Sequence, residues 1–474
     1  MLLVFVHGWS VTDTSTYGGM PDALVAAGAA AGIVIERVDL RLGRYVSFQD
    51  EVRMSDLIRA FDHALRTDIP NNQDGKREFS CITHSTGGPV VREWLDWAYG
   101  ARLAESPLRH LVMLAPANHG SALAALGKGV IGRIMYGLDG VEPGQGVLDW
   151  LCLGSDESWD LAHRALRTDL GQGPTFPFVL GGQTIDHKFY DFVNRYLNEI
   201  GSDGVVRLTG ANLNYSAVRL AETEELLTAS EDDKRLGDPS GRRYGKLVPR
   251  AFERTPRTAF GVVPGASHSG DDIGIIRSVT PANYQTKPVV PLIIDCLKVT
   301  DAAGYSAQVD ALEQETAKVQ KTENDGRRFV MFAFRVSDEH GRRIDDYDMI
   351  LIGDGHSAEQ LPKGFFIDRQ KNKQSQALVY YMDYDKLATL NDLGIRVIAR
   401  PTIGWPGEDA KAFSGYYPCE FRMTGAEFRD SVKPNETFYI DVVLQRRVAR
   451  ETFRLDPLGA PSDFKKVKPG PVIV

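Results

Sequence analysis

One serine stands where an apolar, strand-like run meets a glycine-rich helix start. Residues 81–91 read CITHSTGGPVV, so Ser85 is followed closely by Gly87 and Gly88. A strand, a serine and a helix joined this tightly form a nucleophile elbow, in which small neighbours let strand and helix cross and the strained turn exposes the hydroxyl. The first N–H groups of a helix have no partner within it and carry partial positive charge, so the Thr86 N–H is expected to stabilise an oxyanion. The segment predicts acyl chemistry at Ser85.

The start of the chain contains a candidate for a second donor to the oxyanion. The segment FVHGW, residues 5–9, is an apolar run that ends in His7, Gly8 and Trp9. In acyl-transfer enzymes, a second oxyanion donor comes from a loop after an early strand. We expect the Trp9 N–H to be that donor, with Gly8 leaving room for the backbone to turn and His7 beside the substrate. A plain loop is the alternative for His7 and Gly8 taken alone.

These motifs resemble the α/β-hydrolase superfamily, and within it the lipase branch that includes hydrolases similar to glycosylphosphatidylinositol deacylases. The resemblance covers about residues 1–297 and departs from the commonest pattern at Thr83, where glycine is usual, and before His119, where proline is frequent. It implies a serine ester hydrolase with the chain order serine, acid, histidine. The segments that carry the resemblance are VFVHGW, THSTGG, LAPANHGSALA, SDGVVRL and GASHSGD.

The superfamily order places the catalytic base after the last strand of the sheet. The segment VVPGASHSGDD contains an apolar strand, a loop of small residues and then His268. His268 is therefore the predicted general base, which takes the proton of Ser85 and returns it to the leaving group. His119 lies in a loop after another predicted strand and is expected to line the substrate site.

Two residues are candidates for the acid that orients the base. Asp203 precedes a short strand in GSDGVVRL and resembles the acidic residue of lipases with an NDG-V element, whereas Asp186 stands three residues after the predicted strand at 176–183. The resemblance favours Asp203. A simple Asp-Gly turn is the structural alternative for Asp203, because that dipeptide forms turns readily.

The first 298 residues are expected to form an α/β-hydrolase domain with a doubly wound, mostly parallel sheet. Strand-like and helix-like runs alternate there, which is typical of parallel sheets covered by helices. Two segments interrupt the alternation, an apolar one at 122–168 and a charged, loop-like one at 212–257. Both are interpreted as cap or insert segments over the site, with a surface excursion as the alternative.

The pattern of apolar and turn-forming residues changes near residue 300. Short aromatic and β-branched runs separated by turn residues predict an antiparallel β-sandwich over residues 299–450. Residues 451–474 are rich in proline and glycine and are expected to be an extended tail.

Composition excludes several classes of protein. The 474 residues carry a formal net charge of -8 without a cluster of lysine and arginine, so no nucleic-acid surface is expected. The four cysteines lack metal-site spacing and are predicted to be reduced thiols of a cytoplasmic protein. No signal peptide or membrane-spanning segment is recognised, although export without a cleaved signal is compatible with the sequence. No cofactor or catalytic metal is expected; the acidic loop at 345–348 is interpreted as a solvated turn, with calcium binding as the alternative.

The sequence therefore predicts a lipase or phospholipase that acts through an acyl-enzyme on Ser85, with a lipid or ester substrate and a membrane surface as partners. By analogy, a bacterial antimicrobial lipase effector is a more specific hypothesis. A short-chain carboxylesterase and an acyltransferase would use the same triad, and a non-catalytic interaction module could use the same fold. The protein partner of the second domain is not predicted.

Overall fold

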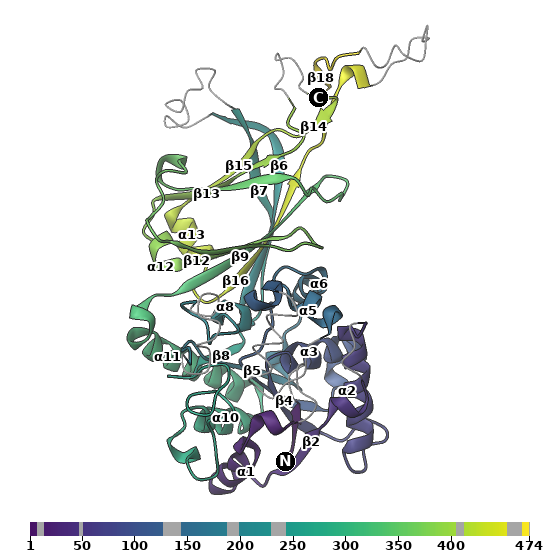
Figure 1. Cartoon of the computed structure of the whole chain (residues 1–474), viewed down its shortest axis with the longest axis vertical. Helices are drawn as coiled ribbons and strands as arrows, with labels where there is room; N and C mark the ends of the chain where they lie inside the picture. Colours follow the sequence, from purple (N-terminus) through teal and green to yellow (C-terminus); the bar gives the residue numbers. More distant parts are fainter. Residues whose placement is uncertain are drawn as a thin grey trace.

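The molecule is built from two bodies stacked along its long axis, an α/β part at the N-terminal end and a β-rich part beyond it (Figure 1). The computed structural model describes residues 1–6, 14–46, 51–126, 144–186, 199–228, 243–403, 412–452 and 467–473. Among these residues, no helix is both long and apolar enough to cross a membrane, and all four cysteines are free.

The α/β part is organised around a six-stranded sheet in which every pair of neighbouring strands is parallel. Along β1, Leu2, Val4 and Val6 join the core on one face, and Leu3 and Phe5 join the core on the other. Burial on both faces explains why these strands read as continuous apolar runs. In sheet order the strands are β2 (Glu36–Leu40), β1 (Leu2–Val6), β3 (Phe79–His84), β4 (Leu108–Leu114), β5 (Phe176–Gly181) and β8 (Ala259–Val262).

Helices cover both faces of this sheet. On one face, α2 (Met54–Asp68) and α3 (Gly87–Ala98) bury Phe61 and Trp94, whose rings meet edge to face. On the other face lie α1 (Met20–Ala30) and α10 (Val289–Leu297). This arrangement confirms the predicted α/β-hydrolase class of fold.

The α/β part extends beyond the expected boundary at residue 298. Helix α11 (Ala302–Thr322) lies along β8, the edge strand of the sheet, and buries Leu312 in its core. The Ala259 N–H donates to the Tyr305 hydroxyl at 3.1 Å and the Val262 N–H donates to Thr316 Oγ1 at 3.0 Å. The helix therefore satisfies donors that an edge strand would otherwise leave open.

The C-terminal region is rich in strands, as expected, but they lie in one mixed nine-stranded sheet rather than an antiparallel sandwich. Strand β16 pairs in parallel with both β6 and β9, and the remaining pairs are mostly antiparallel. Strands near opposite ends of the sheet line the same apolar interior, which shows that the sheet curls. In sheet order the strands are β10 (Tyr347–Ile352), β13 (Asp392–Ala399), β15 (Cys419–Thr424), β7 (Arg243–Arg254), β6 (Tyr215–Thr228), β16 (Thr437–Leu444), β9 (Phe329–Asp338), β12 (Leu378–Asp383) and β11 (Phe366–Lys371).

The expectation that residues 212–257 form a loop-like cap is wrong for their described part. They contain β6 and β7, which pair with each other and sit in the middle of the nine-stranded sheet. Residues 229–242, between the two strands, lie outside the described residues. The charged composition is explained by the outer half of β6, where Glu224 and Glu225 are exposed. The chain thus leaves the first sheet after β5, builds two strands of the second, and returns to the first as β8.

The described part of the apolar segment 122–168 lies between the two bodies. It contains α5 (Gln145–Leu151) and α6 (Asp156–Ala165). Trp150 packs with the core of the α/β part, whereas Trp159 packs with the outer face of the nine-stranded sheet. The segment is apolar because it is covered from both sides. Residues 127–143 of the predicted cap lie outside the described residues.

Short elements complete the fold. The helices α8 (Leu208–Ala211), α12 (Tyr384–Leu387) and α13 (Gly425–Ser431) connect strands. At the C-terminal end, β14 (Ser414–Gly415), β17 (Arg447–Ala449) and β18 (Val472–Ile473) form a three-stranded sheet, so the predicted tail includes a paired strand. Residues 453–466 of that tail lie outside the described residues.

A cut at the sequence boundary should not yield an independent catalytic domain. We predict that residues 1–298 expressed alone are insoluble or unfolded, because β6 and β7 lose β16 and β15 as partners and β8 loses α11. Soluble yield and far-ultraviolet circular dichroism, compared with the full chain, measure this. A soluble, cooperatively unfolding 1–298 fragment would contradict the interleaved arrangement.

Candidate active site

The turn at Ser85 has the backbone of a nucleophile elbow. Strand β3 ends at His84, Ser85 has φ of 54°, and α3 begins at Gly87. Residues other than glycine rarely adopt this left-handed backbone conformation. Two hydrogen bonds hold the turn: the Ser85 N–H donates to the Leu114 carbonyl at 3.1 Å, and the Ala117 N–H donates to the Ser85 carbonyl at 3.3 Å. The turn thus holds Ser85, which is half-buried, over the ends of β3 and β4.

Gly88 permits the close crossing behind this turn. A Cβ atom at Gly88 would lie 2.8 Å from the Cβ atom of Pro116, closer than real side chains approach. Thr83, the departure from the common pattern, is fully buried in β3, so the threonine side chain fits within the packed sheet at this position.

His268 and Asp203 form a buried pair. His268 Nδ1 lies 2.9 Å from Asp203 Oδ2, and each side chain is at most 5% exposed. The other carboxylate oxygen, Oδ1, accepts the N–H groups of Val205 at 3.0 Å and Val206 at 2.7 Å. These two contacts fix the orientation of the Asp203 carboxylate. The arrangement leaves Nε2 of His268 as the nitrogen able to exchange a proton with a neighbouring hydroxyl.

His84, which sequence reasoning did not single out, supports the same histidine. Its ring centroid lies 4.6 Å from that of His268, and its Nε2 lies 3.2 Å from the His268 carbonyl oxygen. Burial, reinforced by the nearby His268, lowers the pKa of His84 well below its ordinary value. A neutral His84 with its proton on Nε2 therefore donates to the backbone of His268. Because His84 directly precedes Ser85, this contact keeps His268 next to the elbow.

The loop that carries Asp203 is tied to the nine-stranded sheet. The Tyr381 hydroxyl donates to the Ile200 carbonyl at 2.9 Å, and the Thr437 hydroxyl donates to the Thr209 carbonyl at 2.8 Å. The buried Arg207 guanidinium pairs with Glu199 at 2.6 Å and with Asp368 on β11. The Cζ atom of Arg207 also lies 4.3 Å from the centroid of the Tyr381 ring. The second sheet thus positions the partner of His268.

Asp186 lies near this site, beside the loop that follows His268. A Cβ atom at Gly270 would lie 2.5 Å from Asp186 Oδ2, so the Asp186 carboxylate packs against the loop that follows His268. The Nδ1 atom of His268 lies 2.9 Å from the carboxylate of Asp203, the other acid candidate.

The remaining predicted site residues differ in what the structure says of them. Thr86 is buried and occupies the N-cap position of α3, next to Ser85. His7, Gly8 and Trp9 lie outside the described residues, so the predicted second oxyanion donor stays a prediction.

His119 has a different environment from the one expected of a substrate contact. Its Nδ1 lies 2.8 Å from the Tyr439 hydroxyl and its Nε2 lies 2.8 Å from the Asn212 carbonyl oxygen. One ring nitrogen thereby joins the loop after β4 to β16 of the nine-stranded sheet, and the other joins it to the end of α8. The contact with Tyr439 spans 320 residues of sequence, so local pattern could not have indicated it.

Within the described ranges, no group of three or more histidine, cysteine or acidic side chains is arranged to hold a metal ion. In the acidic loop, Asp346 and Asp348 both pair with Arg400. Asp354 accepts the N–H groups of Asn391 at 2.7 Å and Asp392 at 3.0 Å. These carboxylates have protein partners.

Comparisons with known proteins were made for the whole chain. No family profile matches the sequence, and no curated protein matches it. Among solved structures, phospholipase PlaB from Legionella pneumophila is 40% identical with a TM-score of 0.86, over 99% of this chain and 98% of that one. The same phospholipase in complex with thio-NAD is 39% identical with a TM-score of 0.85, over the full length of both chains. The likeness therefore extends through both bodies of the molecule.

The buried His119 predicts an acid-sensitive junction. Burial, with a smaller effect of the Arg92 charge, lowers the pKa of His119 to about 3. Between about pH 6.5 and that value, the unfolded chain takes up a proton at His119 and the folded chain does not. The free energy of unfolding therefore decreases by about 1.4 kcal/mol for each unit by which the pH is lowered. Urea unfolding across this range should show a slope about 1.4 kcal/mol per unit smaller in His119→Gln than in the wild type. Equal slopes would refute this role for His119.

Proposed function

Because the chain belongs to the PlaB family of phospholipases, we propose that it cleaves the acyl ester bonds of phospholipids with Ser85 as the nucleophile. The chain is a serine ester hydrolase of the lipase and phospholipase class, with a lipid or ester as its substrate. The observation that carries the assignment of residues is the buried hydrogen bond between His268 and Asp203 beside the Ser85 turn.

The first half of the reaction forms an acyl-enzyme. His268 Nε2 takes the proton of Ser85 as the hydroxyl oxygen bonds to the ester carbonyl carbon. Asp203 accepts the Nδ1 proton of His268, which fixes the ring orientation and stabilises its positive charge. The tetrahedral intermediate then loses the lysophospholipid alkoxide, which takes the proton from His268, and the acyl group stays on Ser85.

Charge develops on the carbonyl oxygen during this step. The Thr86 N–H at the start of α3 is the proposed first donor to that oxyanion, and the Trp9 N–H is the proposed second. Donors fixed in advance contribute because they need no reorganisation when charge appears.

Water completes the cycle. His268 takes a proton from water, the hydroxide attacks the acyl carbon, and Ser85 leaves with that proton as the fatty acid is released. A phospholipid presents its esters at a membrane surface, so the proposal includes contact with such a surface. The more specific hypothesis of an antimicrobial effector stays a prediction.

Replacement of the nucleophile gives the first test. Ser85→Ala should abolish labelling by a fluorophosphonate probe and lower kcat for phosphatidylcholine hydrolysis at least a thousandfold, on the order seen for other serine hydrolases. Released fatty acid and lysophospholipid are measured by mass spectrometry.

The same assay separates the rival activities. A series of esters of increasing chain length distinguishes a phospholipase from a short-chain esterase, since preference for acetyl or butyryl esters would contradict the proposed substrate. Transfer of labelled acyl groups to added alcohol in preference to water would indicate an acyltransferase. Wild-type protein that does not react with the probe would support a non-catalytic module.

The two acids give a matched pair of variants. Asp203→Asn should lower kcat about 10³- to 10⁴-fold, because His268 loses the acceptor that fixes its tautomer. Asp186→Asn should cost far less, since the hydrogen bond to Nδ1 of His268 comes from Asp203. A larger loss of kcat in Asp186→Asn than in Asp203→Asn would reverse the assignment.

A further inference from the structure

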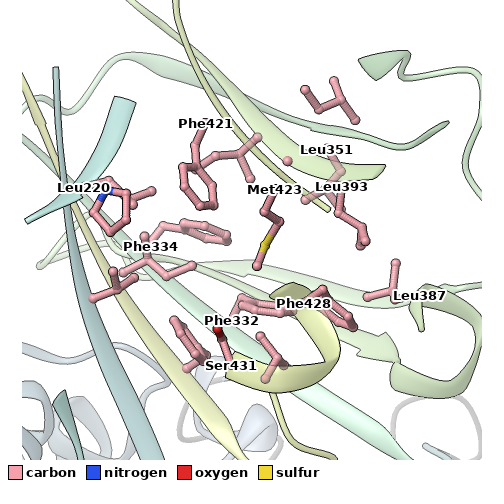
Figure 2. Close-up of a pocket in the computed structure, with 18 of the residues that line it drawn as sticks. Leu220, Phe332, Phe334, Leu351, Leu387, Leu393, Phe421, Met423, Phe428 and Ser431 are labelled. Carbon is pink, nitrogen blue, oxygen red and sulfur yellow. The ribbon is translucent and has the colours of Figure 1, made fainter. Parts of the chain in front are cut away.

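The interior of the nine-stranded sheet contains an apolar cavity of about 260 Å³ (Figure 2). Ser431 contributes the one polar side chain to its wall, and no charged side chain is among the described residues that line it. The wall comprises Val218, Leu220, Pro249, Phe252, Phe332, Phe334, Leu351, Ile352, Leu361, Met382, Leu387, Leu393, Gly394, Ile395, Phe421, Met423, Phe428, Ser431, Val432, Phe438 and Ile440.

The cavity follows from the way the sheet curls. Alternate side chains point inward on several strands, as Phe332 and Phe334 do on β9 and Phe421 and Met423 do on β15 (Figure 2). These side chains leave part of the interior unfilled. Protein cores normally close such space, because atoms that line a void lose contacts. A dry apolar cavity of roughly 150 Å³ is already large enough to take up benzene.

The wall of the cavity reaches solvent. Phe252 on β7 lines the cavity and is 49% exposed, and the neighbouring Pro249 is also exposed. Leu351 and Met423, on strands farther along the sheet, are half-buried. A ligand can therefore enter past Phe252 while a polar end group remains in water.

We propose that this cavity binds one long hydrocarbon chain, as part of a fatty acid or lipid, at a site separate from Ser85. The walls favour such a ligand because each of its methylene groups moves from water into apolar surroundings, and no charged side chain of the wall loses its hydration. The choice of an acyl chain rests on the proposed function, since that reaction releases fatty acids. The chain could be supplied either by free fatty acid or by a phospholipid in a membrane.

Binding can be measured without turnover. The full-length Ser85→Ala protein is the starting point, so the result does not depend on whether Ser85 is the nucleophile. Equilibrium dialysis with radiolabelled palmitate counts bound fatty acid, and sedimentation with phosphatidylcholine vesicles measures capture of membrane lipid. Loss of Ser85 labelling in the earlier experiment and loss of binding here are separate outcomes.

One substitution fills the cavity and a matched one does not. Met423 points into the cavity (Figure 2), so Met423→Trp adds bulk where the ligand would lie. Leu226 is 42% exposed on β6 and lies outside the cavity wall, so Leu226→Trp adds the same indole elsewhere. Phe252→Ser alters the mouth at an exposed position and serves if the Met423 variant does not fold. Circular dichroism and thermal unfolding verify each protein.

The outcomes separate the two sources. If Met423→Trp removes one equivalent of bound palmitate and Leu226→Trp does not, the cavity binds free fatty acid. If Met423→Trp instead lowers vesicle capture and leaves palmitate binding intact, it binds membrane chains. If neither Met423→Trp nor Phe252→Ser changes either measurement while both proteins fold, the proposal is overturned.

Discussion

The loop around Asp203 has to satisfy both sheets at once, and the rest of the molecule depends on that constraint. One side of the loop meets His268 through a buried hydrogen bond. The other side is held by Tyr381 and Thr437 of the second sheet and by the ion pairs of Arg207. Removing one partner of a buried charge pair is costly, so these contacts stabilise the observed position of the loop. The second sheet is therefore part of the framework that positions Asp203 against His268, the proposed catalytic base, in addition to any role in binding lipid.

Buried histidines serve this arrangement in their neutral form. Burial keeps His84 and His119 uncharged, and each uses its ring to fix a backbone or hydroxyl group of another segment. His268 differs because a carboxylate faces it, so a positive charge on its ring has a partner. The surroundings of these three imidazoles therefore suit two of them to structural roles and His268 to the proton transfer proposed for it.

What the sequence could predict depended on the range of each interaction. The elbow at Ser85 is local, since the turn, the glycines and the flanking strand and helix lie within a few residues, and its strained backbone could be predicted. The preference for Asp203 over Asp186 needed a resemblance, because both stand at positions that a triad acid uses. The contact of His119 with Tyr439 spans 320 residues, and no local pattern encodes it. The strands β6 and β7 could not be predicted from the sequence, because exposed charges mask their alternation.

The interleaving of the two sheets also bears on when the enzyme becomes competent during synthesis. Ser85, Asp203 and His268 all leave the ribosome in the first three fifths of the chain, but Thr437, which anchors the Asp203 loop, lies close to its end. Strand β16, the parallel partner of β6, is also among the last strands made. Contacts between such distant segments form late, after most of the chain is available. A nascent or truncated chain therefore carries the proposed triad without the framework that aligns it, and we expect lipid cleavage only once synthesis is nearly complete.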